Sequence, residues 1–166
     1  MMTDQKQQAM IDAEGLTIIR IFDAPRELVW QAWTEPEMIQ HWWGPEGCTA
    51  PEIRVELRIG GNYFFHMEGN GFTHYHVGVY KEIVPQEKLV CTQCFSDADG
   101  NVVSPAGMGM PDMPEETLLS ITFEDTSDGK TKMTFRHEGM PQEFGDMASG
   151  GWGQSFDKMA QLVESN

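Results

Sequence analysis

The hydrophobic pattern at the start of the chain predicts a single β-strand. Residues 16–22 (LTIIRIF) are rich in β-branched side chains, which favour an extended backbone. The stretch before it, residues 1–14, opens on mostly polar residues (MMTDQKQQAM), and we expect it to form a flexible N-terminal leader. We expect one folded domain over the remaining residues, 15–166.

Two short helices are predicted after this strand. Pro25 suits the first position of a helix, and the apolar residues that follow share one helical face. That face holds Leu28, Val29, Ala32 and Trp33. Thr34 and Glu37 have the spacing of a capping box, in which the Thr side chain caps the next helix. The apolar face of this second helix holds Met38, Ile39 and Trp42, and Gly44-Pro45 ends it.

A series of short strands is predicted next. Alternating or β-branched segments are separated by turn residues such as Gly60-Gly61. Connections this short imply that neighbouring strands are antiparallel. The predicted strands cover residues 52–57, 62–67, 72–84, 89–95, 118–123 and 132–136. Residues 96–115 interrupt the series as a long loop, and a loop of this length is uncommon unless it has a function.

The C-terminal residues 142–164 predict one long helix. Its apolar stripe consists of Trp152, Phe156, Met159 and Val163. The first half of this helix contains four glycines, each of which costs about 1 kcal/mol relative to alanine inside a helix. These glycines are Gly145, Gly150, Gly151 and Gly153. Either the helix packs closely on the sheet at these positions, or it leaves space there for a ligand.

Together these elements predict an α+β fold. A curved antiparallel sheet wraps around the long C-terminal helix, and two short helices follow the first strand. One helix covers only part of such a sheet. At the glycine-rich end of the long helix, where the two short helices also lie, we expect a cavity.

Composition and charge restrict the partners. Lys and Arg total 11 against 26 Asp and Glu, which gives a formal net charge of −15. A field of this sign repels the phosphates of nucleic acids and of anionic membranes, so neither is an expected partner. No run of about 18 apolar residues is present, so no membrane span is expected. Without a hydrophobic signal segment or a disulfide framework, we expect a cytoplasmic protein.

Several segments resemble one known family. The run from Phe22 to Trp30 (FDAPRELVW) resembles the opening of the START-like (SRPBCC) superfamily. More narrowly, it resembles the group named after the C-terminal domain of the Hsp 90 ATPase activator. The segments that fit this group are WWGP at 42–45, GGNYFF at 60–65, GVYKEI at 78–83, LVCT at 89–92, GMP at 109–111 and GWGQSFDKM at 151–159.

This resemblance extends over residues 15–164 and implies the helix-grip fold with a ligand cavity between the sheet and the C-terminal helix. It does not imply a reaction. Members of the superfamily bind lipids, hormones or polyketides, and only some of them are catalysts.

Three histidines form the densest polar cluster on the predicted strands. His74 and His76 are two residues apart, so both imidazoles point to the same face of a strand. A turn near residues 69–71 would place His66 roughly opposite His74, which completes a ligand set suited to zinc. The alternatives are a solvated polar face, or hydrogen-bond partners for a ligand in the cavity. We expect no metal and no cofactor.

Aromatic residues supply most of the predicted cavity lining. Residues 62–67 offer two rival inward faces, Tyr63 with Phe65 or Phe64 with His66, and we favour the second. The methionine-rich loop around Met110 is expected to fold over the cavity, and a surface loop or a homodimer contact is the alternative. The predicted lining is Trp33, Trp42, Trp43, Phe64, His66, His74, His76, Met110, Trp152 and Phe156.

The leading functional hypothesis is the binding of a hydrophobic small molecule, such as a lipid or a polyketide, in this cavity. An enzyme of the cyclase or hydrolase type, with a cavity histidine as acid, base or metal ligand, is the alternative. The family resemblance adds a third hypothesis, a co-factor of the Hsp 90 chaperone.

Overall fold

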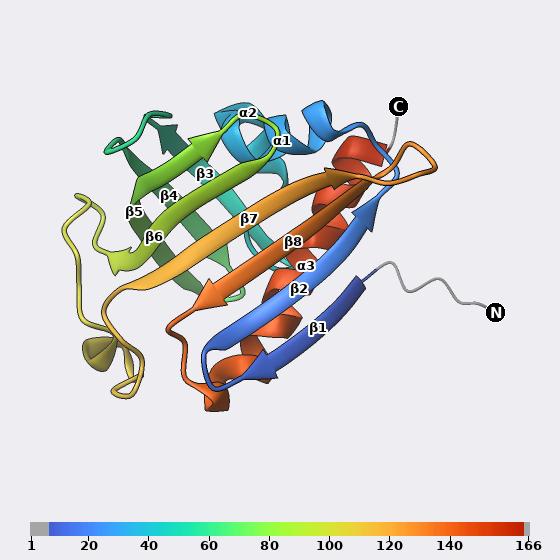
Figure 1. Cartoon of the computed structure of the whole chain (residues 1–166). Coiled ribbons are helices and arrows are strands. Elements are labelled where there is room, and N and C mark those ends of the chain that lie inside the picture. The colour runs from blue at the N-terminus through green and yellow to red at the C-terminus, as the bar shows by residue number, and fades with distance from the viewer. Residues whose placement is uncertain (1–6, 165–166) are drawn as a thin grey trace.

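The structure, a computed structural model that describes residues 7–164, contains one eight-stranded antiparallel sheet and three α-helices (Figure 1). Its strands are β1 (Gln7–Asp12), β2 (Gly15–Phe22), β3 (Cys48–Val55), β4 (Asn62–Gly69), β5 (Phe72–Val84), β6 (Lys88–Ser96), β7 (Thr117–Asp125) and β8 (Thr131–Glu138). The helices are α1 (Arg26–Thr34), α2 (Pro36–Trp42) and α3 (Gly145–Glu164), with short 3-10 turns at Pro105–Met108 and Gln142–Phe144. The strand order is β1-β2-β8-β7-β6-β5-β4-β3.

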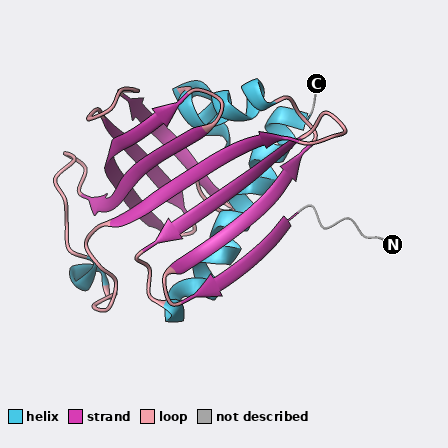
Figure 2. Cartoon of the chain, in the orientation of Figure 1, coloured by secondary structure: helices cyan, strands magenta, loops and turns pink. Residues whose placement is uncertain are grey.

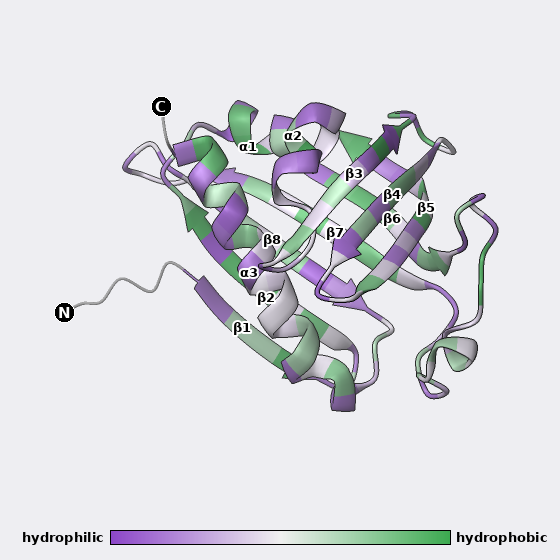
Figure 3. Cartoon of the chain, turned by 180° about the vertical axis from the view of Figure 1, so that it is seen from behind, coloured by the Kyte–Doolittle hydropathy of each residue, from purple (hydrophilic) through white to green (hydrophobic). Residues whose placement is uncertain are grey.

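All three α-helices lie on one face of the curved sheet, called here the inner face (Figures 2 and 3). Helix α3 runs along β2 and β8, and α1 and α2 lie beside its C-terminal half (Figure 1). The buried stripe of α3 includes Phe156, Met159 and Val163, as the apolar periodicity predicts. The predicted α+β fold is confirmed. Within residues 7–164, no helix is long and apolar enough to cross a membrane.

Strand β1 lies inside the stretch that we expect to be a flexible leader. It pairs antiparallel with β2, and Met10 faces Thr17 across the ladder. It also contacts α3 closely, because a Cβ atom on Gly145 would lie 2.6 Å from the Ile11 side chain. The sequence does not predict this strand because most of its side chains are exposed, as is usual at a sheet edge. The first part of the expected leader, residues 1–6, lies outside the described residues.

The two short helices form where the pattern predicts them, but their junction differs. Thr34 is the last residue of α1, and its Oγ1 donates a hydrogen bond to the Trp30 carbonyl at 3.0 Å. Pro36 is the first residue of α2, and no side-chain hydrogen bond caps this helix. The predicted capping box of Thr34 and Glu37 is therefore wrong, because Thr34 still belongs to α1 and the N-cap position of α2 is Glu35.

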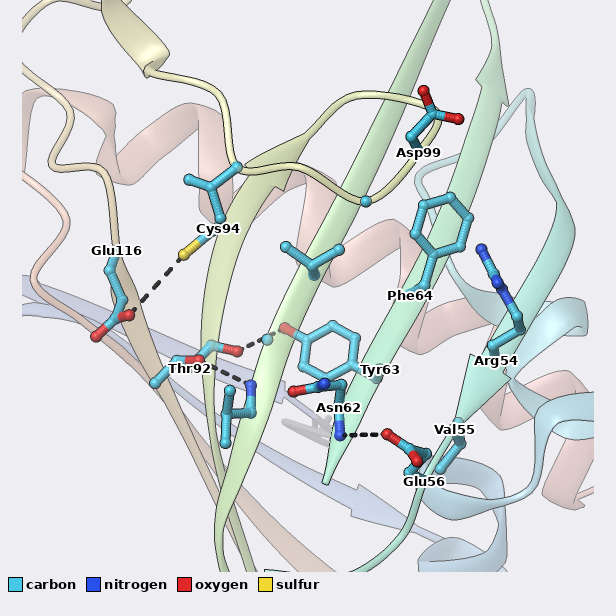
Figure 4. Close-up of a pocket in the computed structure, with 15 residues that line it drawn as sticks. Arg54, Val55, Glu56, Asn62, Tyr63, Phe64, Thr92, Cys94, Asp99 and Glu116 are labelled. Carbon is cyan, nitrogen blue, oxygen red and sulfur yellow. Dashed lines mark hydrogen bonds between the residues drawn. The ribbon is translucent and has the colours of Figure 1, made fainter. Parts of the chain in front are cut away.

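A tyrosine on β4 links three neighbouring strands. Tyr63 lies opposite Gly78 of β5, and its hydroxyl donates a hydrogen bond of 2.6 Å to the Thr92 carbonyl of β6 (Figure 4). Burial raises the pKa of Tyr63 well above its ordinary value, so the hydroxyl remains a donor. A Cβ atom at position 78 would lie 2.0 Å from the Thr92 carbonyl oxygen and 2.4 Å from the Tyr63 ring. Only glycine fits between these two groups.

We expect the substitution Gly78→Ala to lower the free energy of unfolding by about 1–3 kcal/mol, because the added methyl group must displace the Tyr63 ring or a backbone carbonyl. Urea unfolding measures the effect. Gly150→Ala is the matched control: no atom lies within 4 Å of its added Cβ, and alanine favours the helix, so it should unfold at higher urea concentration than the native sequence. Equal stability of Gly78→Ala and the native sequence would contradict this packing.

Candidate functional site

A cavity of about 270 Å³ lies between the inner face of the sheet and the N-terminal half of α3. It is bounded by the end of α2, by β4, β5, β6 and β8, by the long loop between β6 and β7, and by the segment that leads into α3. Its lining residues are Trp43, Gly44, Pro45, Met67, His74, His76, Gln93, Phe95, Met110, Met113, His137, Met140, Phe144, Met147, Ala148, Gly151, Trp152 and Ser155. Most of these side chains are apolar, and none carries a fixed charge.

The glycines of α3 serve both of the purposes that the sequence suggests. A Cβ atom on Gly145 would lie 2.6 Å from the Ile11 side chain, and one on Gly153 would lie 3.0 Å from Gln7. These two glycines allow close packing against β1. By contrast, apart from its two chain neighbours and the helix backbone, no atom lies within 4 Å of a Cβ built on Gly151, and Gly151 lines the cavity. At this position the helix leaves space open.

Five of the ten predicted lining residues surround the cavity: Trp43, His74, His76, Met110 and Trp152. Three others, Trp33, Trp42 and Phe156, are buried in the core beside it instead. Trp42 contacts Trp43 with 5.6 Å between ring centroids, and Phe156 stacks with Trp152 at 5.7 Å. These core rings position the side chains that line the cavity.

The remaining two predicted residues, Phe64 and His66, point to the outer face of the sheet. The β4–β5 register pairs Phe65 with His76, so the inward side chains of β4 are Tyr63, Phe65 and Met67. His66 lies opposite Tyr75, with 4.7 Å between the rings. Our preference for Phe64 and His66 as the inward pair is therefore wrong.

The turn explains this error. Asn70 and Gly71 form a two-residue hairpin loop, and both have positive φ angles, 52° and 84°. Asn-Gly favours a two-residue turn of this type. A three-residue turn over 69–71 would place His66 opposite His74, as expected from the sequence, whereas the two-residue turn places His66 opposite Tyr75. A shift of one residue moves His66 to the opposite face. The zinc ligand set of His66, His74 and His76 does not converge, and the described residues contain no cluster of three metal-ligating side chains.

His137 is the main lining residue that the sequence argument does not identify. The predicted strand ends at residue 136, whereas β8 extends to Glu138. Met133 and Phe135 are both buried on the inner face, so the alternation along β8 continues to His137. This period of two is the signal that identifies the third cavity histidine.

Two hydrogen bonds hold the His137 ring in a defined tautomer. The Trp152 Nε1–H donates to His137 Nδ1 at 3.3 Å, so the proton of neutral His137 lies on Nε2. That Nε2 lies 2.9 Å from the Thr117 hydroxyl oxygen, and the Thr117 hydroxyl in turn donates to the Gln93 carbonyl at 3.4 Å. Burial lowers the pKa of His137 to about 4. His137 is therefore a neutral link between α3 and the sheet.

His76 is also neutral. Burial, followed by repulsion from His74 and His137, lowers the pKa of His76 to about 3. Partial burial lowers the pKa of His74 as well. At pH 7 the three imidazoles therefore leave the cavity uncharged, with hydrogen-bonding nitrogens in an apolar wall.

A second hollow of about 520 Å³ lies on the outer face of the sheet (Figure 4). Its rim carries the charged side chains of Arg54, Glu56, Asp99 and Glu116. An apolar molecule bound there would lie beside these charges, which is less favourable than a lining without charged side chains. Its one thiol, Cys94, is not activated, because burial and then the nearby Glu116 raise its pKa. We therefore take the inner cavity as the candidate site.

The neutral state of His76 makes stability depend on pH. Its pKa is lower in the folded protein than in the unfolded chain, so unfolding takes up a proton between about pH 6.5 and pH 3. Stability should therefore fall as the pH drops below about 6.5. Between pH 7 and pH 5, we expect the native protein to lose about 2 kcal/mol more than the His76→Phe variant in urea unfolding.

The control for this measurement is His41→Phe, which removes an exposed histidine of α2. This variant makes the same substitution at a histidine that does not line the cavity. Parallel pH profiles for the native protein and His76→Phe would show that His76 is not held neutral by burial.

Comparisons with known proteins agree with this fold. The family described as Activator of Hsp90 ATPase homolog 1-like protein matches residues 23–164. A crystal structure of a protein from Chromobacterium violaceum is 26% identical, with a TM-score of 0.73 over 97% of this chain and 99% of that chain. One from Mycobacterium smegmatis is 22% identical, with a TM-score of 0.76 over 98% of this chain and 94% of that chain.

The AHSA1 protein from Silicibacter pomeroyi is 19% identical, with a TM-score of 0.72 over 90% of this chain and 98% of that chain. No curated protein matches the chain. The family match covers most of the sequence, and the structural likenesses extend over nearly the full length of both partners. The chain therefore belongs to the Activator of Hsp90 ATPase homolog 1-like family.

Proposed function

We propose that this protein binds an uncharged, mainly apolar small molecule in the inner cavity. The observation that carries the proposal is the mainly apolar cavity of about 270 Å³ that Gly151 lines. A glycine inside a helix lowers stability, and at Gly151 the missing side chain leaves space on the cavity wall. The family fold, in which a sheet encloses a long helix, is consistent with a ligand in this position.

The cavity volume limits the size of the ligand. An engineered cavity of about 150 Å³ in another protein holds benzene, so about 270 Å³ suits roughly ten non-hydrogen atoms. A substituted aromatic ring or a small fused ring system has this size. A long lipid chain would need the cavity to widen.

Methionines form the outer side of the cavity. Met110 and Met113 come from the long loop, and Met147, which is 66% exposed, comes from the first turns of α3. Methionine side chains adapt to apolar surfaces of irregular shape. This arrangement supports a ligand that enters beside the loop and is then covered by flexible thioether side chains.

The charge distribution supports an uncharged ligand. The lining contains no Asp, Glu, Lys or Arg among residues 7–164, so nothing there compensates a buried charge. The net charge of −15 also disfavours anions. The same lining contains no cysteine, and its serine hydroxyl, on Ser155, donates to the Gly151 carbonyl at 3.1 Å. These features support binding rather than catalysis.

The substitution Gly151→Leu tests the proposal because it places a large side chain in the open space. With naphthalene as the probe, we expect the dissociation constant measured by equilibrium dialysis to rise at least about tenfold. Gly150→Leu is the matched control, since Gly150 lies next to it on the exposed side of α3 and does not line the cavity. Both variants carry the same change in helix propensity.

Native binding of naphthalene by Gly150→Leu together with loss of binding by Gly151→Leu would support the inner cavity. Equal binding by the two variants, or no saturable binding by the native protein, would refute it. Urea unfolding of both variants shows whether either one is misfolded.

A further inference from the structure

Two ring nitrogens on the cavity wall have no hydrogen-bond partner among the described residues. They are Nε1 of Trp43 and Nδ1 of His76. Both residues line the cavity, and their exposed fractions are only 4% and 8%. Their rings are neighbours, arranged edge to face with 5.8 Å between centroids. Buried polar groups in proteins are nearly always hydrogen-bonded, so this pair needs an explanation.

Neighbouring tryptophans do not share this feature. The indole N–H of Trp42 donates to the Ala32 carbonyl at 2.7 Å, and that of Trp152 donates to His137 at 3.3 Å. The indole of Trp33 lies 3.2 Å from the Met133 sulfur. Among these four clustered indoles, the one without a partner is the one at the cavity end of α2. The missing partner of Trp43 therefore reflects its position beside the cavity and not a general lack of hydrogen-bond acceptors in the core.

The two imidazoles of the inner wall differ in the same way. His137 uses both of its nitrogens, toward Trp152 and Thr117. His76 lies between Trp43 and Phe95, whose rings have centroids 5.8 Å and 5.1 Å from its own, and its Nδ1 has no hydrogen-bond partner among the described residues. The two rings that carry the unpaired nitrogens are thus neighbours on the wall of a mainly apolar site.

We propose that the ligand carries one uncharged oxygen, a hydroxyl or a carbonyl, that binds between Trp43 and His76. This inference rests on the proposed function and adds the chemical class of the ligand. The Trp43 indole can only donate, so its partner must be an acceptor. Neutral His76 can accept or donate according to its tautomer, and a hydroxyl group satisfies both residues at once.

The surroundings exclude a charged partner group. No cation lies on the described cavity wall to pair with a carboxylate, and no carboxylate lies there to pair with an amine. Both nitrogens are almost completely covered by neighbouring atoms, so the proposal requires the two rings to rotate before an oxygen can reach them. The ligand class is therefore a small neutral ring compound with one polar oxygen.

Three probes of similar shape test this inference: naphthalene, 2-naphthol and 2-naphthoate. We expect the native protein to bind 2-naphthol about tenfold more tightly than naphthalene, and 2-naphthoate more weakly than 2-naphthol. In Trp43→Phe and in His76→Phe the preference for 2-naphthol over naphthalene should shrink to less than about threefold.

Trp30→Phe is the matched control. Trp30 is a buried indole that packs against Phe123, with 5.6 Å between ring centroids, and does not line the cavity. This variant should keep the preference for 2-naphthol. Trp43→Phe and Trp30→Phe make the same substitution, so a difference in their preference for 2-naphthol is due to the position of the lost indole.

The possible results separate this inference from the proposed function. Equal binding of naphthalene and 2-naphthol by the native protein, or an unchanged preference in Trp43→Phe and His76→Phe, would overturn the oxygen site and leave apolar binding intact. Tightest binding of 2-naphthoate would overturn the uncharged class. Failure of all three probes to bind the native protein would refute the proposed function itself.

Discussion

The packing of α3 against β8 through aromatic rings is the interaction on which the rest of the structure depends. Phe135 of β8 contacts both Trp152 and Phe156 of α3, with centroid distances of 4.5 and 5.3 Å. Phe156 extends the contact to Trp33 and Trp42 of the short helices, at 6.1 and 6.2 Å. Aromatic pairs of this kind add to the large free energy gained from burying the rings. One continuous cluster therefore fixes α3, α1 and α2 on the sheet.

This cluster also determines where the cavity lies. On its C-terminal side, the stripe of α3 fills the space above the sheet with side chains such as Met159. On its N-terminal side, the helix presents Ala148 and Gly151 while the sheet continues across β5 and β6. Methionines and neutral histidines line the space between α3 and the sheet at this end. The cavity thus forms because α3 carries no large aromatic ring on its inner side between Gly145 and Trp152.

The sequence was sufficient for the fold and for half of the site. Strong periodicity predicts seven of the eight strands and the long helix, and the glycine-rich start of that helix indicates the cavity end. The face of β4 depends on a single residue of register, which the Asn70-Gly71 turn sets and alternation alone does not. Strand β1 and the two roles of the α3 glycines depend on contacts between distant segments, such as Ile11 with Gly145.

The most direct test is a crystal structure of the native protein soaked with 2-naphthol. We expect electron density for the probe between the sheet and α3, with its rings beside Gly151 and its oxygen about 3 Å from Trp43 Nε1. A cavity filled with the protein's own side chains would refute binding at this site. Density for the probe in the outer hollow beside Phe64, and none in the inner cavity, would refute it equally.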